Sequence, residues 1–595
     1  MLLAPVLAMA IANCSSTGSS PGTGGNTSSG GSTGLGGNTG KGGSGQGGST
    51  ANGGSNGSGG APVASGGATS SGGTTSSGGT TSSGGSQASG GTTSSGGSSA
   101  AGGTTSAGGS SAAGGNENRG GSNATGGGTS AGGTTGAGGS TSTGVTVQLD
   151  QTEQTIEGFG LNTALGGGNV PWDPLYTTTG NPGLGFSIVR VGMNWSSTSS
   201  PGTLSGSLPS ASYNAKVIGS VWTAPASCRT NIPKNGYGGH LNTTCYESFA
   251  TAIANFAKSQ NLYAMSAANE PDFQACGGQG EIGPPCNGDY DTMLYTANEM
   301  VAWVKVLGAK LHALNPPVKL LAPEPSEWIH LWSNTSATGS TVASHPNSSD
   351  PLNCGCFGND PVTTGCASTC AQGNGYDYGH WLAKDTTAWG LVDIVATHEY
   401  DSQKAMAWPS DVDGGKRSKE VWETEVSGVM YWPEQGFSSD INNGIAVAGW
   451  VHSALVVGQA SAWLYWWYQP SGSDNEGLVA SGSSTLTKRA YTIGNYSKFV
   501  RPGYVMVDVA GNSNTNLLLS AFKGTDGTVV VVAINKGTAA STVPIAISGG
   551  TAPASCTPYV TSSSANLTAG TAVTVTGGSF TASLAATTVT TFVCK

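Results

Sequence analysis

From Val145 onward, short apolar runs alternate with longer amphipathic stretches. Eight of the apolar runs are bounded by turn residues and predict strands at Thr155–Gly160, Phe186–Met193, Val217–Trp222, Leu262–Ala268, Val318–Ala322, Val392–His398, Glu420–Glu425 and Ala462–Tyr468. Stretches between them, such as Tyr246–Ser259, Thr292–Leu314 and Ile441–Val457, repeat apolar residues at the spacing of a half-buried helix. Eight strands separated by helices predict an α/β fold, a (β/α)8 TIM barrel.

The pattern changes near Gly503. The runs YVMVDVA, NLLLSAF, TVVVVAIN, STVPIAIS and TTVTTFVC are short, rich in β-branched residues and separated by turns. They predict an antiparallel β-sandwich side domain over residues 503–595, after the barrel over residues 145–502. The run VTVQLD, which begins at Val145, alternates like a strand. We expect it to join the side domain, so that the barrel module begins with a shared strand.

Residues 15–144 carry no pattern of this kind. They contain three charged residues, Lys41, Glu117 and Arg119, and no aromatic residue. Near-repeats such as SSGGTT lack the apolar positions that stacked repeats bury. Composition of this type predicts a disordered linker rich in Gly, Ser and Thr.

Residues 1–14 form an apolar segment that ends at Cys14. The segment is typical of a secretory signal followed by a lipidation site, although no Lys or Arg precedes its apolar stretch. We expect an exported protein, extracellular or on the cell surface. Lipidated Cys14 would attach it to the outer leaflet of a membrane, and plain secretion is the alternative.

The ten remaining cysteines form an even set, which suits disulfide bonds in an exported protein. Pairing by proximity predicts Cys228 with Cys245, Cys276 with Cys286, Cys556 with Cys594, and two bonds among the four cysteines between Cys354 and Cys370. The last group could also be read as a zinc site, but its Gly/Asn/Thr-rich context favours disulfides. No metal or other cofactor is expected.

The formal charge of -10 argues against nucleic acid or an anionic membrane surface as a partner. A neutral or weakly charged substrate fits better. The chain after residue 144 holds all 15 Trp, 17 Tyr and 11 Phe residues, enough for a large core. We expect a monomer.

Two of the predicted strands end on carboxylates. The fourth run, LYAMSAANEP, stops at Asn269 and Glu270, and the seventh, KEVWETEVSG, carries Glu423 and Glu425. Barrel enzymes do their chemistry at this end of the strands. Hydrolysis of a glycosidic bond with retention needs two carboxyl groups about 5 Å apart. Strand alternation points Glu423 and Glu425 the same way, so spacing alone does not choose between them.

Several segments in this order resemble glycoside hydrolase family 30. They are TIEGFG, FSIVRVGMN, SVWTAPASCRTN, GGHL, SAANEP, VATHEYD, WETE and TKRAYTIGNYSKFVRPGY, and they span most of residues 145–595. The resemblance implies that Glu270 is the general acid/base and Glu425 the nucleophile, and Glu423 falls on a variable position. It also implies that Asn269 bonds the sugar 2-hydroxyl and that Arg190 lies under the nucleophile.

By the same resemblance, the sugar subsite nearest the scissile bond would be lined by Trp222, His398, Tyr400 and Trp466. Trp463, Trp466 and Trp467 are close neighbours on one strand. Since successive side chains on a strand point to opposite faces, at least one of them is expected in the core behind the barrel.

The chain departs from the family pattern in three places. The loop after the NEP motif carries the candidate bridge between Cys276 and Cys286. Cys228 and Arg229 replace the usual Met-Lys pair after the third strand. The loop WWYQPSGSDNEGLV lacks the Arg with which the glucuronoxylan-specific branch clamps a glucuronate, and it adds Asp474 and Glu476. A strict requirement for glucuronate is therefore not expected.

These features predict a retaining endo-acting hydrolase of cell-wall polysaccharide, with β-1,4-xylan as the first choice of substrate. An endo-β-1,6-galactanase or β-1,6-glucanase is the alternative. An exo-acting enzyme like glucosylceramidase, or a glycan-binding surface lipoprotein without activity, would also fit the fold.

Overall fold

The computed structural model describes residues 144–180, 182–194, 202–230, 239–272, 293–332, 377–400, 405–428, 438–470 and 475–595. Cys14, the linker, and the cysteines from Cys276 to Cys286 and from Cys354 to Cys370 lie outside these ranges. Within them, the helices are too short or too polar to cross a membrane.

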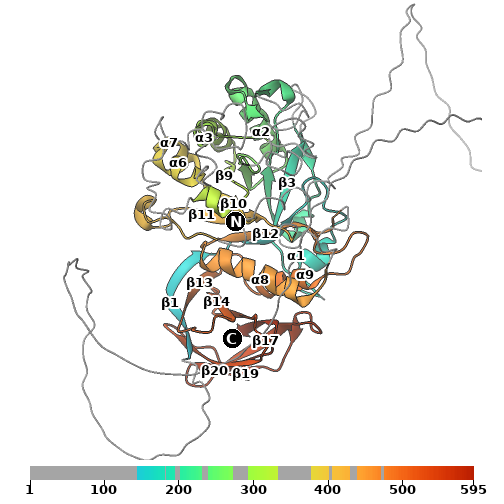
Figure 1. Ribbon diagram of the computed structural model, residues 1–595, viewed down its shortest axis with the longest axis vertical. Helices are drawn as coiled ribbons and strands as arrows, with labels where there is room; N and C mark the ends of the chain where they lie inside the picture. Colours follow the sequence, from blue (N-terminus) through green and yellow to red (C-terminus); the bar gives the residue numbers. More distant parts are fainter. Residues whose placement is uncertain are drawn as a thin grey trace, which may run out of the picture. The chain divides into compact units, whose positions relative to one another are not determined.

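Eight parallel strands form a closed barrel (Figure 1). They are β2 (Gly158–Asn162), β3 (Ile188–Asn194), β5 (Lys216–Ser220), β8 (Ala264–Ser266), β9 (Lys319–Pro323), β10 (Ile394–His398), β11 (Glu420–Glu425) and β12 (Ala462–Trp467). The barrel closes because β2 pairs with β12 on one side and β3 on the other. Each strand overlaps one predicted run, and the predicted TIM barrel is confirmed. Short β4 (Thr203–Ser205) pairs antiparallel with β3.

The first barrel strand begins three residues later than predicted. Thr155 ends β1 (Val145–Thr155), which belongs to the other sheet, and the chain turns into the barrel at Ile156. Gly160 then allows β2 to lie close against β3, since an added Cβ there would sit 2.0 Å from the carbonyl oxygen of Ile188.

Helices cover the outside of the barrel. They are α1 (Trp172–Tyr176), α2 (Tyr246–Ser259), α3 (Ala297–His312), α4 (Trp328–Leu331), α6 (Tyr378–Lys384), α7 (Thr386–Leu391), α8 (Ile441–Val456) and α9 (Lys488–Ser497). Helix α3 begins later than predicted because Thr296 and Glu299 form a capping box that starts the helix at Ala297. Its Trp303 stacks on Phe249 of α2, with ring centroids 5.6 Å apart.

The remaining strands form the C-terminal β domain, apart from the hairpin β6 (Arg229–Thr230) and β7 (His240–Leu241). They are β1, β13 (Val505–Ala510), β14 (Leu517–Lys523), β15 (Val529–Asn535), β16 (Ser541–Ser548), β17 (Ser555–Thr561), β18 (Thr568–Ala569), β19 (Val573–Thr574), β20 (Ser579–Leu584) and β21 (Thr588–Cys594). Strands β17 and β20 were not predicted, because Pro558 and small polar residues interrupt their apolar pattern.

The run that begins at Val145 lies within this sheet as β1, between β13 and β16. It pairs antiparallel with β13 and parallel with β16. The chain therefore enters the β domain first, passes through the barrel, and returns to the same sheet.

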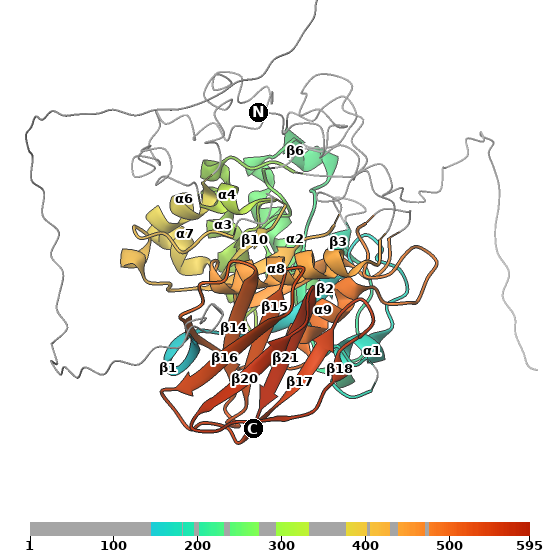
Figure 2. The same ribbon diagram turned by 60° about the horizontal axis from the view of Figure 1, so that its bottom comes forward.

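The β domain has two apolar sides. Residues such as Val531 and Phe592 fill its own core, whereas Phe522 and Val530 join the core of the barrel module. Helices α8 and α9 lie between the barrel and the sheet, as Figure 2 shows. Asn495 of α9 donates from Nδ2 to Thr591 Oγ1 at 3.0 Å, and the Thr591 hydroxyl donates to the Asn495 carbonyl at 2.6 Å. Hydrogen bonds and apolar packing together join the two parts.

Candidate active site

Glu270 stands just beyond the end of β8. Its backbone has φ of 46°, a left-handed conformation that is uncommon for residues other than glycine. The Glu270 amide donates to the carbonyl of Glu324 at 3.0 Å. Its side chain lies 3.1 Å from His398, measured from Oε1 to Nδ1. Glu270 is 7% exposed and is therefore buried.

Glu425 is the last residue of β11 and is 5% exposed. Arg190 of β3 donates from Nη1 to Glu425 Oε2 at 2.7 Å, and the Tyr400 hydroxyl donates to Oε1 at 3.1 Å. The two carboxylate oxygens therefore accept hydrogen bonds from different parts of the chain, one from β3 and one from just beyond β10 (Ile394–His398).

The two carboxylates face each other across a narrow gap. One side-chain oxygen of Glu270, one of Glu425 and one ring nitrogen of His398 all lie within 4.8 Å of one another. Parallel strands that end at one rim of the barrel bring these three residues together although they are far apart in sequence.

Arg190 is fully buried and organises the floor of the site. Besides Glu425, Nη1 donates to Asn162 Oδ1 at 2.9 Å, and Nη2 donates to Asn269 Oδ1 at 2.6 Å. The guanidinium carbon lies 4.9 Å from the centre of the Trp222 ring. With its oxygen held by Arg190, the Asn269 amide can offer Nδ2 as a donor to a sugar hydroxyl.

Burial and neighbouring charges shift the pKa values of Glu425 and His398. Burial raises the pKa of Glu425 to about 7, because the attraction of His398 and Arg190 does not fully offset desolvation and the repulsion of Glu270 and Glu324. Burial alone would lower the pKa of His398, but Glu425, Glu270 and Glu324 raise it to about 10. His398 is therefore an imidazolium at neutral pH.

Comparison with known proteins identifies the family. Residues 504–592 match the family model described as the glycosyl hydrolase family 30 beta sandwich domain. The chain is similar to glucuronoxylanase XynC of Bacillus subtilis strain 168, with 28% identity over 408 residues that cover 64% of this chain and 75% of the relative. A family 30 endoxylanase structure from Clostridium papyrosolvens is 27% identical with a TM-score of 0.53, and the match covers 76% of this chain and 100% of that one. The chain belongs to glycoside hydrolase family 30.

A second structure shares the fold. The family 30 subfamily 8 xylanase from Clostridium acetobutylicum has a TM-score of 0.54 at 24% identity, over 76% of this chain and 99% of the other. The chain is a glycoside hydrolase, and the family resemblance of its sequence segments is confirmed.

Glu423 plays a different part in this family 30 site from Glu425. Its Oε1 accepts from the Glu425 amide at 3.0 Å and its Oε2 from the Leu464 amide at 3.2 Å. Glu423 is fully buried, and burial raises its pKa well above the ordinary value. Both of its oxygens bond backbone amides of β11 and β12, whereas the oxygens of Glu425 bond the side chains of Arg190 and Tyr400.

Trp463 and Trp466 of β12 lie on opposite faces, as strand alternation requires, whereas Trp467 departs from this alternation. Trp463 lies in the large core and its Nε1 donates to Glu399 at 3.4 Å. Trp466 and Trp467 stack on each other at 4.9 Å, and Trp466 lies 6.2 Å from Trp222. A register shift against β2 between Tyr465 and Trp467 explains why two neighbours share one aromatic cluster.

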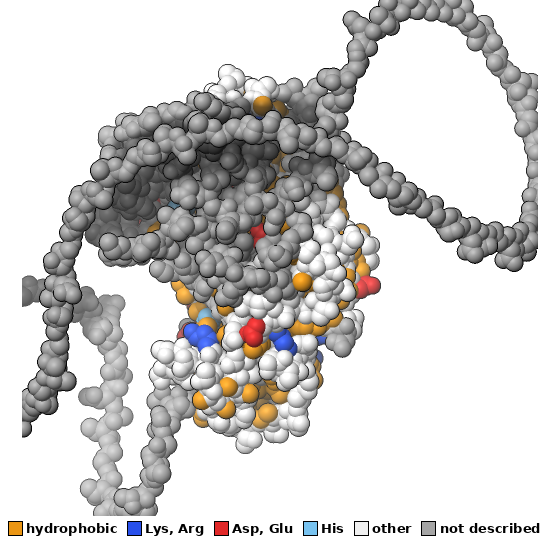
Figure 3. All heavy atoms as spheres, turned by 45° about the vertical axis from the view of Figure 1, so that its right-hand side comes forward, with side chains coloured by type: hydrophobic (Ala, Val, Ile, Leu, Met, Phe, Trp, Pro, Cys, Tyr) orange, Lys and Arg blue, Asp and Glu red, His pale blue; other side chains and the backbone are white. Residues whose placement is uncertain are grey.

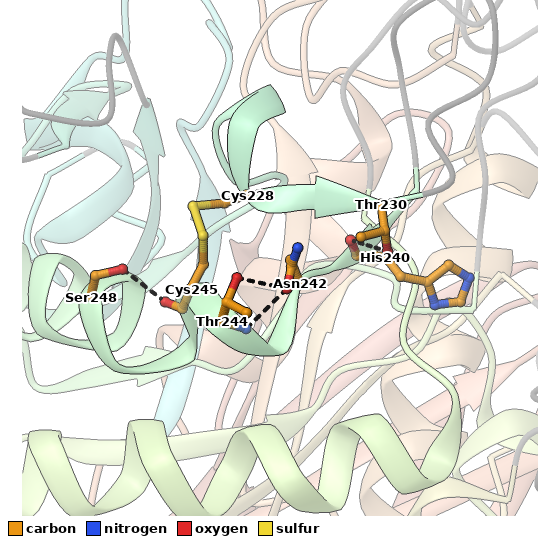
Figure 4. The surroundings of a disulfide bond; sticks show 7 residues. All are labelled: Cys228, Thr230, His240, Asn242, Thr244, Cys245 and Ser248. Atoms are coloured by element: carbon orange, nitrogen blue, oxygen red, sulfur yellow. Dashed lines mark hydrogen bonds between the residues drawn. A yellow bond between two sulfur atoms is a disulfide. The ribbon is translucent and has the colours of Figure 1, made fainter.

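Two predicted disulfides are present, and one of them braces the loop beside Trp222. Cys228 ends a 3-10 turn after β5, and Cys245 immediately precedes α2 (Figure 4). Asn242 Oδ1 accepts hydrogen bonds from the amide and hydroxyl of Thr244 in the same turn. The second bond joins Cys556 of β17 to Cys594 of β21.

Sequence reasoning missed Glu324 and Asn162, which both touch Arg190. Glu324 Oε1 lies 3.1 Å from Arg190 Nε, and both side chains are fully buried. A signal for Glu324 was present, because the apolar run LLAP ends on it just as other runs end on Glu270 and Glu425. Asn162 carried no such signal, since a single amide in a buried strand is common.

Proposed function

We propose that this family 30 enzyme is a retaining, endo-acting hydrolase of β-1,4-xylan that works through a covalent glycosyl-enzyme on Glu425. The observation that carries the proposal is the approach of Glu270 and Glu425 carboxylate oxygens to within 4.8 Å. Retaining glycosidases need a separation of roughly 5–5.5 Å between the carboxyl groups, whereas inverting enzymes need roughly 6.5–9.5 Å to admit a water.

In the first step, Glu425 attacks the anomeric carbon while Glu270 gives its proton to the leaving oxygen. The hydrogen bonds from Arg190 and Tyr400 hold both Glu425 oxygens and favour the ionised form that attacks. In the second step, Glu270 takes a proton from water, the oxygen of which attacks the anomeric carbon and displaces Glu425. Both carboxyl groups return to their starting forms.

His398 orients the acid/base. As an imidazolium it donates from Nδ1 to Glu270 Oε1 at 3.1 Å, which leaves Oε2 as the oxygen that carries the proton. Asn269, held through Oδ1 by Arg190, would donate from Nδ2 to the sugar 2-hydroxyl. Trp222 and Trp466 would offer ring faces to the C–H faces of the sugar.

The choice of xylan rests on the relatives named glucuronoxylanase and endoxylanase. We propose that a glucuronate branch is not required, because no Arg occurs between residues 466 and 479 and Glu476 is nearly buried there. Burial, with the negative charges of Glu425, Glu270 and Glu476, raises the pKa of Tyr400 well above its ordinary value. An anionic branch beside this loop would meet like charge. On the described part of the face in Figure 3, Lys and Arg side chains and Asp and Glu side chains are scattered among apolar and neutral ones.

We propose that the enzyme acts outside the cell as a monomer, on the surface through lipidated Cys14 and residues 15–144. The two disulfides, Cys228–Cys245 and Cys556–Cys594, support an oxidising compartment. Extraction of the full-length protein into detergent, and its release into buffer when Cys14 is changed to Ser, would test the attachment.

Product analysis tests the substrate. The full chain is incubated with arabinoxylan, glucuronoxylan, β-1,6-galactan and β-1,6-glucan, and the oligosaccharides are sized. We expect mixed xylo-oligosaccharides from both xylans. Release from glucuronoxylan alone would contradict independence from glucuronate, and release from a β-1,6-glycan alone would contradict the choice of xylan. NMR of the first product should show the β-anomer, because the mechanism retains configuration.

A further inference from the structure

Glu324 takes no part in the two chemical steps, yet it contacts the groups that carry them out. We infer that Glu324 is a positioning residue that shares the Arg190 guanidinium with Glu425 and thereby limits how tightly the nucleophile is held. The inference rests on the proposed role of Glu425 as nucleophile.

The geometry of Arg190 supports this sharing. Its Nε lies 3.1 Å from Glu324 Oε1, and its Nη1 lies 2.7 Å from Glu425 Oε2, so two carboxylates compete for one cation from different edges. The second Glu324 oxygen accepts from the Ser220 hydroxyl at 3.0 Å, which fixes the carboxylate beside Arg190. Arg190 and Glu324 are completely buried, so water does not screen the interaction.

The backbone of Glu324 supports the acid/base in turn. Its amide donates to the Ala396 carbonyl at 2.9 Å, and its own carbonyl accepts from the Glu270 amide at 3.0 Å. Glu324 and Glu270 both have left-handed backbones, with φ of 67° and 46°. Such conformations persist where surrounding structure determines them, and they gather at active sites. The peptide of Glu324 thus holds one carboxylate, and its side chain acts on the other through Arg190.

The negative charge of Glu324 determines the direction in which it shifts the pKa of Glu425. Burial opposes its ionisation, but Arg190 and His398 lower the pKa of Glu324 to about 2, so it is an anion at working pH. Glu425 faces Arg190, His398, Tyr400, Glu270, Glu324 and Glu423. Without the charge of Glu324, its repulsion of Glu425 would be lost, and Arg190 would pair with Glu425 alone. The nucleophile would then be easier to ionise and less reactive.

Two variants separate charge from shape. Glu324→Gln keeps the size of the side chain and removes its charge, whereas Glu324→Asp keeps the charge but moves it away from Arg190. Both variants keep a residue other than glycine at this left-handed backbone position. We expect Glu324→Gln to move the acid limb of kcat/KM down by about one pH unit and to lower kcat about ten-fold. Glu324→Asp should fall between Glu324→Gln and the wild type in the position of the limb.

Thermal unfolding and xylo-oligosaccharide binding are measured on each variant to establish that it is folded. An acid limb that stays in place in a folded variant, or moves to higher pH, would overturn the inference even if the rate falls, because a merely structural role predicts only the fall. If Glu324→Gln does not fold, the limb of Glu324→Asp against the wild type decides alone.

A different variant tests the proposed function separately from the inference about Glu324. If Glu425→Gln still releases sugar, Glu425 is not the nucleophile and both proposals fall. If Glu425→Gln is inactive while Glu324→Gln has the wild-type rate and pH profile, only the inference about Glu324 falls.

Discussion

At the carboxyl ends of the barrel strands, Arg190, Glu324 and Glu425 form ion pairs that are almost completely buried. At the amino ends, Lys319 pairs with Glu420, and their side chains are 37% and 30% exposed. These amino ends are closed differently, because Lys216 and Lys319 lie 4.9 and 4.8 Å from the centre of the Tyr263 ring. Tyr263 stacks in turn on Trp422 at 6.0 Å.

The difference shows which end depends on its charges. Partly exposed pairs are screened by water and contribute about 0–1 kcal/mol each. A buried pair that loses one partner leaves an uncompensated charge, which costs about 3–5 kcal/mol. The amino end therefore rests on ring packing and tolerates the loss of a charge. At the carboxyl end the charges are buried away from water. Each charge there shifts the pKa of its neighbours.

The largest expected contrast lies on a single strand, β11. Glu425→Gln should reduce sugar release about 10⁴-fold or more, because the proposed nucleophile is lost. Glu420→Gln, the same change at the other end of β11, should stay within about two-fold of wild type, since Glu420 is far from the chemistry. Initial rates on xylan measure both. Azide should restore turnover to Glu425→Gly and give a glycosyl azide of inverted configuration, and equal rates in the two Gln variants would contradict the contrast.

Loss of a cation should lower the free energy of unfolding more at the carboxyl end of the barrel than at the amino end. Arg190→Met leaves Glu324 and Glu425 buried without their partner, and we expect the free energy of unfolding to fall by about 3–5 kcal/mol at pH 7. The matched control is Lys216→Met, which removes a partly exposed partner of Glu157 and should cost about 1 kcal/mol or less. Denaturant unfolding of both proteins makes the comparison. Equal losses would mean that burial does not govern these pairs.

The pH profile should report the buried end. The folded pKa of Glu425, about 7, is above its ordinary value of 4.5, so Glu425 gains its proton as pH falls through about 7. Activity should fall with it, because a protonated carboxyl group cannot act as the proposed nucleophile. His398, with a pKa of about 10, stays charged through this range. Measurement of kcat/KM against pH checks the limb, and a limb centred near 4.5 would show that desolvation of Glu425 has no net effect.

The same shift predicts the sign of a stability change. A carboxyl group with a raised folded pKa favours folding below its unfolded pKa, and this contribution is lost as pH rises from about 4.5 to about 7. Glu425→Gln should remove that part of the pH dependence, which unfolding at several pH values would reveal.

The smallest effect concerns the pair of Lys319 and Glu420. A double-mutant cycle with Lys319→Met and Glu420→Gln should give a coupling below about 1 kcal/mol that shrinks further in 1 M salt. A larger coupling that resists salt would mean that the amino end is as desolvated as the carboxyl end.

Much of this architecture is readable from apolar runs. The bounds of β11 and α2 agree with prediction, because β11 begins and ends on a glutamate and the polar residues Gln260 and Asn261 follow α2. Strand β2 begins late because Thr155 continues a strand of the other sheet, a long-range pairing that no local pattern contains. The stacking of Trp466 on Trp467 depends on a local register shift, and strict alternation predicts the opposite.

The site divides in a similar way. A carboxylate after an apolar run marks Glu270, Glu324 and Glu425 alike, but only the closed barrel assigns each its partner. Spacing alone did not distinguish Glu423 from Glu425 as the second carboxylate of the site. They are separated by what their oxygens meet, which is backbone amides for Glu423 and the side chains of Arg190 and Tyr400 for Glu425.

The position of β1 in its sheet determines which part of the molecule bears a force applied to the chain. Residue 144 leads directly into β1, which is hydrogen-bonded to β13 on one side and β16 on the other. The last strand, β21, lies in the same sheet, between β15 and β17. A force applied through either end of residues 144–595 would first load the β domain in shear. The catalytic barrel would be spared until that sheet gives way.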